Sequence, residues 1–220
     1  MSAQAPKTPN PSAPTAASWA YAESFRPESE AAAAARAAAA DLGLTEIGQG
    51  TASMLLLLAR SVNARSAVEI GSGAGVSGLA LLEGMDSAGI LTSIDAEHEN
   101  QAAARRIFGQ QGIPTRRFRL IAGQALDVLP KLSDGAYDLV FVNGDKLEYV
   151  EYVAQALRLL RHGGLLVMNH ALWRSLVAEE SNEDDETIVI REALAAVTDN
   201  DDFTSALTPV SDGLLIAVKG

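Results

Sequence analysis

From residue 66 onward, short β-branched runs alternate with stretches whose apolar residues recur at helical spacing. The strand candidates are SAVEI (66–70), ILTSID (90–95), RFRLIAG (117–123), DLVFVN (138–143) and GLLVMN (164–169). Helices are predicted between them near residues 76–85, 98–112, 124–132 and 147–161. Such alternation predicts a parallel sheet with helices on both faces, the α/β class.

The predicted helix 147–161 has a clear apolar face. Val150, Val153, Leu157 and Leu160 recur at helical spacing, so we expect that face in the core. The sequence His162-Gly163-Gly164 is typical of a helix that ends on a C-cap glycine.

The end of the chain breaks the alternation. A helix near 186–197 is followed by FTSALTP (203–209), the turn Ser-Asp-Gly (211–213) and LLIAVK (214–219). Asp-Gly between two apolar runs predicts a hairpin. The hairpin places an antiparallel strand in an otherwise parallel sheet, an ending that differs from ordinary dinucleotide-binding folds.

The N-terminal region divides into a tail and two helices. Residues 1–18 are rich in Pro, Ala and Ser and are expected to form a disordered tail. The run AAAAARAAAA predicts a helix, because alanine has the highest helix propensity, and a second helix is predicted over about 48–63. We therefore expect one domain over 19–220, with N-terminal helices over 19–63 and the sheet-containing core over 64–220.

Composition narrows the classes of partner. A net charge of −11 and a pI near 4.7 argue against nucleic acid or an anionic membrane as the main partner. The lack of cysteine excludes disulfides and thiolate chemistry. Neither an export-type apolar segment in residues 1–18 nor a membrane-spanning run is present in the sequence, so we expect a cytoplasmic protein with a small-molecule partner.

The stretch AVEIGSGAGVSG (67–78) is the strongest candidate binding motif. Gly71, Gly73 and Gly75 follow a predicted strand and precede a helix, as in turns that bring a nucleotide-like ligand against bare backbone. Asp95 ends the next strand, where an acid binds a ribose, and it could also cap the following helix. These residues alone do not separate NAD from other adenosine ligands.

Five motifs in order carry a family resemblance: VEIGSGAGVSG, TSID, LIAGQALDVL, YDLVFVNGDKLEYVEY and LRLLRHGGLLVMNHALW. Over about residues 45–220 the chain resembles the class I S-adenosylmethionine-dependent O-methyltransferases of the catechol and caffeoyl-CoA type, and particularly their small bacterial members. The resemblance implies a Rossmann-like, doubly wound, seven-stranded sheet that is mostly parallel, S-adenosyl-L-methionine as cofactor, methyl transfer to a hydroxyl of a small aromatic acceptor, and a homodimer.

The resemblance also assigns cofactor-binding roles position by position. The matching residues are Ile47, Glu69, Gly71, Ser72, Gly73, Ser77, Asp95, Ala96, Gly123, Gln124, Ala125 and Asn143.

The chain departs from the family where relatives bind a divalent cation. Relatives end the fourth strand in D-x-D-K and the fifth in D-N, whereas this chain has Asn143-Gly144-Asp145-Lys146 and Asn169-His170. Amides replace both carboxylates at Asn143 and Asn169, and magnesium prefers negative oxygens. We therefore expect metal-independent chemistry. A metal site with an unusual ligand set, and a protein that binds the cofactor without catalysis, stay open as alternatives.

Without a metal, a side chain must handle the proton of the acceptor. Lys146 matches the lysine proposed as base in the family, and His170 has a reference pKa suited to proton transfer, so both are catalytic candidates. Trp173 matches the acceptor loop and is expected to line the acceptor pocket, whereas Tyr149 and Tyr152 could line it or fill the core. The acidic run 179–186 is expected to be a solvated loop.

Overall fold

The computed structural model describes residues 14–220, so most of the predicted tail lies outside the described residues. The first described helix, α1 (Ala16–Glu23), begins inside that predicted tail, and the Thr15 side chain caps it. The other α-helices are α2 (Glu30–Asp41), α3 (Gln49–Ser61), α4 (Val76–Gly84), α5 (His98–Gln110), α6 (Ala125–Val128), α7 (Tyr149–Leu159) and α8 (Asp185–Thr198). The strands are β1 (Ser66–Ile70), β2 (Ile90–Asp95), β3 (Phe118–Ala122), β4 (Tyr137–Val142), β5 (Leu160–Asn169), β6 (Phe203–Thr208) and β7 (Leu214–Lys219).

The seven strands form one sheet in the order β3-β2-β1-β4-β5-β7-β6. The first five strands of that order pair in parallel, and β7 pairs antiparallel with both β5 and β6. The fold predicted from the alternation of apolar runs and from the C-terminal hairpin is therefore confirmed.

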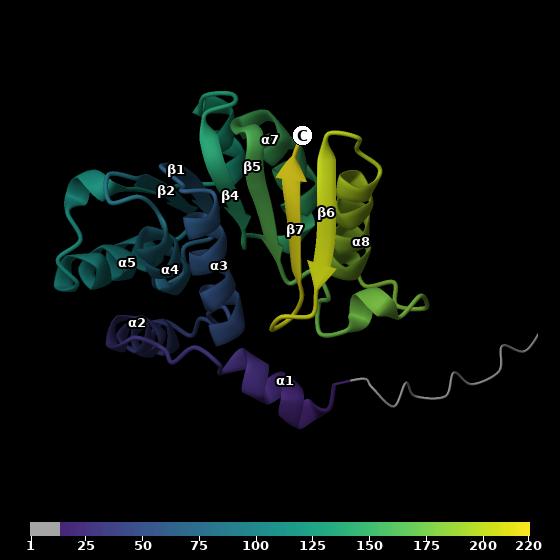
Figure 1. Cartoon of the computed structure of the whole chain (residues 1–220), viewed down its shortest axis with the longest axis horizontal. Coiled ribbons are helices and arrows are strands. Elements are labelled where there is room, and N and C mark those ends of the chain that lie inside the picture. Colours follow the sequence, from purple (N-terminus) through teal and green to yellow (C-terminus); the bar gives the residue numbers. More distant parts are fainter. Residues whose placement is uncertain (1–13) are drawn as a thin grey trace, which may run out of the picture.

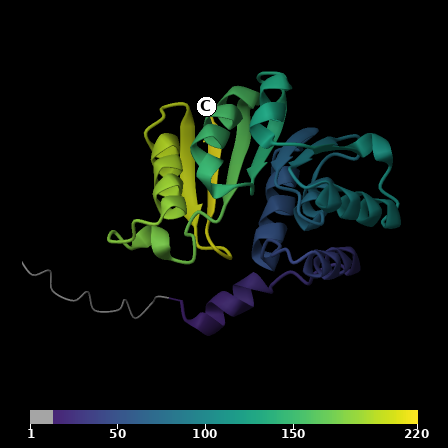
Figure 2. The same cartoon turned by 180° about the vertical axis from the view of Figure 1, so that it is seen from behind.

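Helices cover both faces of the sheet, as Figures 1 and 2 show from opposite sides. One hydrophobic cluster lies between the sheet and α3, α4 and α5, and includes Leu55, Leu81 and Phe108. The other lies between the sheet and α7 and α8, and includes Tyr149 and Ile190. Because both faces are buried, the central strands consist of near-continuous apolar runs.

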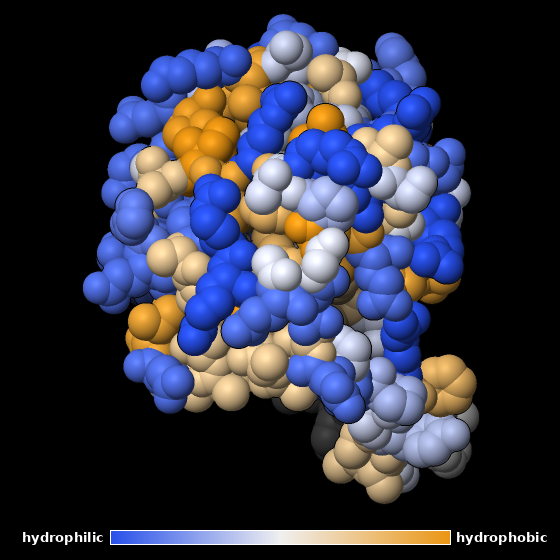
Figure 3. Space-filling view, turned by 90° about the vertical axis from the view of Figure 1, so that its left-hand side faces the viewer, coloured by the Kyte–Doolittle hydropathy of each residue, from blue (hydrophilic) through white to orange (hydrophobic). Residues whose placement is uncertain are grey.

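The first two of the three described helices before β1 differ in how they attach to the body. Helix α2 buries Ala35, Ala38 and Ala39 and packs on α5, because alanines allow close approach. Figure 3 shows this side of the molecule, largely hydrophilic apart from a few apolar patches and a paler band that follows α2. Helix α1 buries no residue, but the Glu23 carboxylate accepts hydrogen bonds from the Gly50 amide at 2.8 Å and the Ser211 hydroxyl at 2.7 Å.

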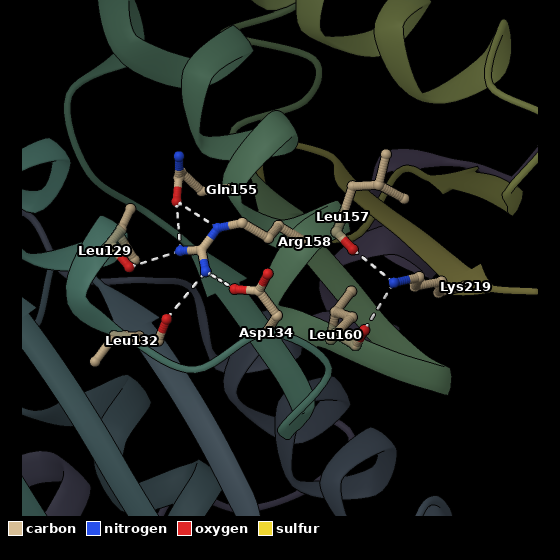
Figure 4. A network of polar contacts seen from close by, with 8 residues as sticks. All are labelled: Leu129, Leu132, Asp134, Gln155, Leu157, Arg158, Leu160 and Lys219. Atoms are coloured by element: carbon tan, nitrogen blue, oxygen red, sulfur yellow. Dashed lines mark hydrogen bonds and ion pairs between the residues drawn. The ribbon is translucent and has the colours of Figure 1, made fainter.

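The glycine cap predicted after the helix 147–161 is wrong. The 3-10 turn η3 (Lys146–Glu148) leads into α7, which ends at Leu159, and Leu160 already begins β5. Figure 4 shows that Lys219 donates to the carbonyls of Leu157 and Leu160 instead, at 2.7 and 2.9 Å. The Leu157 carbonyl in the last turn of the helix and the Leu160 carbonyl just after it thus find a donor on β7, so no glycine turn is needed.

In the same region, Arg158 of α7 extends to the segment before β4. Its guanidinium donates to the carbonyls of Leu129 and Leu132 and pairs with Asp134 (Figure 4). The sequence predicts one helix over 124–132 in that segment. Only the short α6 and the 3-10 turn η2 (Leu129–Lys131) form there, because Pro130 lacks the amide hydrogen that a continuing helix requires.

The buried face of α7 also differs from the prediction. Tyr149, Tyr152 and Val153 are buried, whereas Val150 and Leu157 are only partly buried. The Tyr149 hydroxyl donates a hydrogen bond to the carbonyl of Asn169 at 3.2 Å, which fixes this side chain against the end of β5. Within residues 14–220, no helix is both long enough and apolar enough to span a bilayer.

Candidate functional site

Two cavities lie along the carboxyl ends of the parallel strands, where ligands bind in open α/β sheets. The first, which we call the glycine-turn cavity, has a volume of about 440 Å³. It lies at the ends of β3, β2, β1 and β4. The second, which we call the His170 cavity, has a volume of about 410 Å³ and lies at the end of β5. Thr45 and Glu46 line both cavities, so the two cavities adjoin.

The glycine turn forms the floor of the first cavity. Gly71 and Gly73 line the cavity and have φ angles of +86° and +49°, which favour glycine. A Cβ atom on Gly71 would lie 2.4 Å from the carbonyl oxygen of Asn143, so a side chain there would separate β1 from β4. The turn therefore requires glycine both for its backbone angles and for its close contact with β4.

Asp95 holds the glycine turn in place. Its Oδ2 accepts from the backbone amides of Ser72 and Gly73 at 2.9 and 3.1 Å. Its Oδ1 accepts from the amide of Glu97 at 2.9 Å and from the side chain of Asn100 at 3.1 Å. Asp95 thus lines the cavity at the end of β2, as predicted for a ribose-binding acid, and it also organises the start of α5.

Three of the residues assigned to the cofactor are buried behind the turn. Glu69, Ser72 and Ser77 do not line the glycine-turn cavity. Glu69 accepts a hydrogen bond from the Ser93 hydroxyl at 2.6 Å. Burial raises the pKa of Glu69 to about 8, although hydrogen bonds from the hydroxyls of Ser77 and Ser93 act in the opposite direction. The Ser77 hydroxyl thus lies beside the Glu69 carboxylate, and both side chains are buried. Glu69, Ser72 and Ser77 therefore form the buried support of the glycine turn and do not contact the cavity directly.

The remaining assigned residues border the cavities. Ala96, Gly123, Gln124, Ala125 and Asn143 line the glycine-turn cavity, and Ile47 lines the His170 cavity. The structure therefore brings together the loops after β3, β2 and β4, as the sequence predicts.

Sequence reasoning missed Glu46, which lies over the glycine turn. Its Oε1 accepts from the amide of Ala74 at 2.6 Å. Burial raises the pKa of Glu46, and the negative charge of Asp95 acts in the same direction. The hydrogen bond from the Ala74 amide and the positive charge of Arg36 act in the opposite direction. The sequence around residues 45–50 contains no motif that would have predicted a contact between Glu46 and the glycine turn.

The His170 cavity brings the two catalytic candidates together. Lys146, His170 and Trp173 all line it. The Lys146 ammonium lies 5.6 Å from the ring centre of Trp173 and 5.8 Å from that of Tyr149. Burial lowers the pKa of Lys146, so its proton is easier to remove than that of a solvated lysine. Tyr149 itself is buried and fills the core.

His170 forms a pair with Asp212, a residue that sequence reasoning missed. The Nδ1 atom of His170 lies 2.7 Å from Oδ2 of Asp212, which sits in the turn between β6 and β7. Burial and the nearby Lys146 lower the pKa of His170, whereas Asp212 raises it. A carboxylate on Nδ1 favours the neutral tautomer that leaves Nε2 as an acceptor. In the sequence, Asp212 indicates only a hairpin turn.

The positions that bind a cation in relatives carry a different arrangement. The Asn169 side-chain amide donates to the Asn143 Oδ1 atom at 2.9 Å, and His170 is bonded to Asp212. Both amides are neutral and bonded to each other, which does not fit a hard divalent cation. In residues 14–220, no cluster of three or more histidine and acidic side chains is arranged to hold a metal.

Arg191 of α8 anchors the loop that carries Trp173. Its guanidinium donates to the carbonyls of Leu176 and Val177 at 3.0 Å each, and to that of Asn182 at 2.7 Å. The acidic residues of 179–186 are exposed as expected, but the loop is shorter than predicted, because Asp185 and Glu186 already form the first turn of α8.

Comparison with known proteins gives a consistent result. A family model described as O-methyltransferase matches residues 28–220. A Mycobacterium tuberculosis protein named as an O-methyltransferase is 41% identical over 91% of this chain and 90% of its own length. A solved Corynebacterium glutamicum protein has a TM-score of 0.85 at 32% identity, covering 91% of this chain and 94% of that chain. The O-methyltransferase TomG of Streptomyces achromogenes, solved with S-adenosylmethionine, has a TM-score of 0.79 at 27% identity, covering 87% and 90%.

Proposed function

The chain belongs to the O-methyltransferase family, and we propose that it transfers a methyl group from S-adenosylmethionine to a hydroxyl of a small aromatic acceptor without a divalent metal. The observation that carries this proposal is the His170–Asp212 pair, which lines a cavity next to the glycine-turn cavity. It supplies a base where relatives rely on carboxylate ligands.

The glycine-turn cavity fits the cofactor. Gly123 and Gln124 would border the adenine, Asp95 the ribose, and Gly71 and Gly73 the methionine part. When bound, S-adenosylmethionine supplies an electrophilic methyl group on a sulfonium.

The His170 cavity would hold the acceptor hydroxyl and remove its proton. Asp212 orients the imidazole through Nδ1, so Nε2 would accept the proton of the acceptor hydroxyl. The Lys146 ammonium stabilises the oxyanion that forms. Lys146 stays an alternative base, because burial lowers its pKa.

The aromatic acceptor is favoured by the lining of the cavity. The Trp173 side chain meets the His170 ring edge to face, with ring centres 5.7 Å apart, and could stack on an aromatic acceptor. Lys146 lies near the Trp173 ring, so an acceptor between them would have its oxygen close to a cation.

Chelation tests the metal independence. The protein is treated with EDTA, passed through a desalting column and assayed with methyl-labelled S-adenosylmethionine against a panel of phenols and catechols. We expect full turnover after chelation and no stimulation by Mg²⁺ or Mn²⁺. Loss of turnover that Mg²⁺ or Mn²⁺ restores would instead support a metal site with unusual ligands. Binding of S-adenosylhomocysteine with no transfer to any acceptor would support a protein without catalysis.

The proposal also includes a homodimer and a cytoplasmic location. Helix α1 exposes Trp19, Tyr21 and Phe25, and an apolar cavity of about 870 Å³ lies between α1, α3 and the β6–β7 turn. A second copy of this chain would cover that surface, which sedimentation velocity would detect as a dimer. The lack of cysteine is consistent with a reducing compartment.

A further inference from the structure

Glu46 occupies a distinctive place between the two cavities. It lines both of them, and its side chain covers Gly73, where a Cβ atom added to the glycine would come within 2.5 Å of the Glu46 Oε1 atom. Its own contact with the turn is the hydrogen bond from the amide of Ala74. A carboxylate is thus fixed above the end of β1, beside the glycine turn.

The order of the strands identifies which part of a bound cofactor Glu46 would face. The loop after β3 lies at one end of the row and Asp95 follows on β2, and the proposed function assigns the adenine and the ribose to these two places. Glu46 lies above the next strand, β1, before the His170 cavity at β5. The part of the cofactor beyond the ribose, on the way to the acceptor, is the sulfur with its amino-acid end.

Charge then separates the two ionic groups of that amino-acid end. Glu46, Glu69 and Asp95 surround the glycine turn. The negative charges of Glu46 and Asp95 each raise the pKa of Glu69, which shows that the three carboxyl groups lie close enough to repel one another. A further carboxylate beside Glu46 would be repelled, whereas an ammonium would offset this negative charge. The amides of Ser72, Gly73 and Ala74 already donate to Asp95 and Glu46, so these three donors are not left for the cofactor carboxylate.

Arg36 holds the segment that carries Glu46. It is the single charged residue within the alanine run of α2, and its guanidinium donates to the carbonyl of Ile47 at 2.6 Å and to Glu28 at 2.5 Å. The backbone next to Glu46 is therefore tied to α2, so the carboxylate does not depend on a free loop for its position. This gives the one arginine of the run a role.

We propose that Glu46 binds the α-ammonium group of the methionine part of the cofactor and makes that ammonium a required recognition element. The proposal rests on S-adenosylmethionine binding, and is independent of the metal-free chemistry proposed for the acceptor. The main argument for the proposal is the position of the Glu46 carboxylate above the end of β1, and the cluster of negative charges around the glycine turn is a second argument.

Calorimetry on the purified full chain at pH 8 tests the proposal with three ligands. These are S-adenosylhomocysteine, its analogue that lacks the α-amino group, and 5′-methylthioadenosine, which lacks the whole amino-acid end. S-adenosylhomocysteine has a neutral sulfur, so an effect on its binding cannot come from the sulfonium. We expect Glu46→Gln to raise the Kd for S-adenosylhomocysteine about tenfold or more, and to change the Kd for 5′-methylthioadenosine by less than about twofold.

Glu99→Gln is the matched control, because Glu99 is exposed on α5 and the substitution removes the same charge. It should leave all three affinities unchanged. Equal losses for S-adenosylhomocysteine and 5′-methylthioadenosine in Glu46→Gln would overturn the proposal, as would tighter binding of S-adenosylhomocysteine, which would mean that Glu46 competes with the cofactor carboxylate.

The wild-type protein gives a second test that does not depend on the folding of a variant. It should bind the analogue without the amino group at least about tenfold more weakly than S-adenosylhomocysteine. Equal affinity for the two would refute the role of Glu46. Absence of any S-adenosylhomocysteine binding would refute cofactor binding itself, which separates the two failures.

Discussion

Substitution of Asp212 by asparagine isolates the pair that the proposed mechanism depends on. Asp212→Asn keeps the shape of the side chain but replaces the carboxylate that accepts from His170 Nδ1 at 2.7 Å. A hydrogen bond to a charged group contributes about 1.5–3 kcal/mol. The side chains of His170 and Asp212 are 23% and 26% exposed, so we take the lower part of that range because of solvent screening. About 1.5–2 kcal/mol corresponds to a fall in kcat of about 10- to 30-fold.

The pH profile gives a second signature. His170 acts as a base only when neutral, so activity falls as the pH falls through its pKa. Asp212 raises that pKa, and removing the carboxylate should move the acidic limb of the kcat profile to lower pH. The assay is kcat against pH at saturating S-adenosylmethionine and acceptor, for the wild type and for Asp212→Asn.

Asp201→Asn serves as the control, because Asp201 is an exposed acid before β6 and the substitution removes the same charge. Asp212 also accepts from the backbone amide of Arg174 at 2.5 Å, so the substitution weakens a contact with the loop of Trp173 as well. A uniform loss of kcat with an unchanged acidic limb would mean that Asp212 only holds the loop. Wild-type kcat and an unchanged limb in Asp212→Asn would refute the role of the pair altogether.

Two further predictions concern the support of the site. In the ligand-free protein, burial raises the pKa of Glu69 from 4.5 to about 8, so the folded state binds more protons than the unfolded state between those values, and the free energy of unfolding should fall as the pH rises from 5 to 9. Glu69→Gln should remove this fall in the free energy of unfolding, which amounts to roughly a few kcal/mol. Urea titrations at pH 5 and pH 9 measure the free energy of unfolding of both proteins. The same fall in the variant as in the wild type would contradict the argument. Arg191→Met should raise the KM for the acceptor and lower stability by about 2 kcal/mol, because the loop of Trp173 loses its donors, while the Kd for S-adenosylhomocysteine stays unchanged. Arg116→Met is its control, since Arg116 is exposed, and equal losses in the two variants would argue against a role in the loop.

Local patterns were sufficient to predict the sheet and the position of the glycine turn at the edge where the glycine-turn cavity lies. Strands β1 and β2 begin and end where their apolar runs do, because both faces of the sheet are buried and the runs are bounded by turns. Gly71, Gly73 and Asp95 were found for the same reason: a glycine turn and the acid at the next strand end form a signature within about 30 residues. Parallel strands then bring these ends to one edge.

The groups that the sequence did not reveal act across long separations. Glu46 bonds to Ala74, 28 residues away, and His170 to Asp212, 42 residues away. Each carboxylate is locally an ordinary acid, one in a loop and the other in a hairpin turn. The end of α7 was misjudged for a related reason, since Lys219 supplies from β7 the cap that a local glycine was expected to provide.

The sequence by itself therefore determined the order of elements, the closing hairpin and the glycine turn, because these depend on periodicity and backbone preferences of neighbouring residues. Only the tertiary structure decided that Glu46 and Asp212 face the two cavities. Pairing of β7 with β5 brings the turn containing Asp212 beside His170, and the packing of α2 on the body brings Glu46 over the glycine turn. Such contacts are set by how whole elements pack, which no short stretch of sequence encodes.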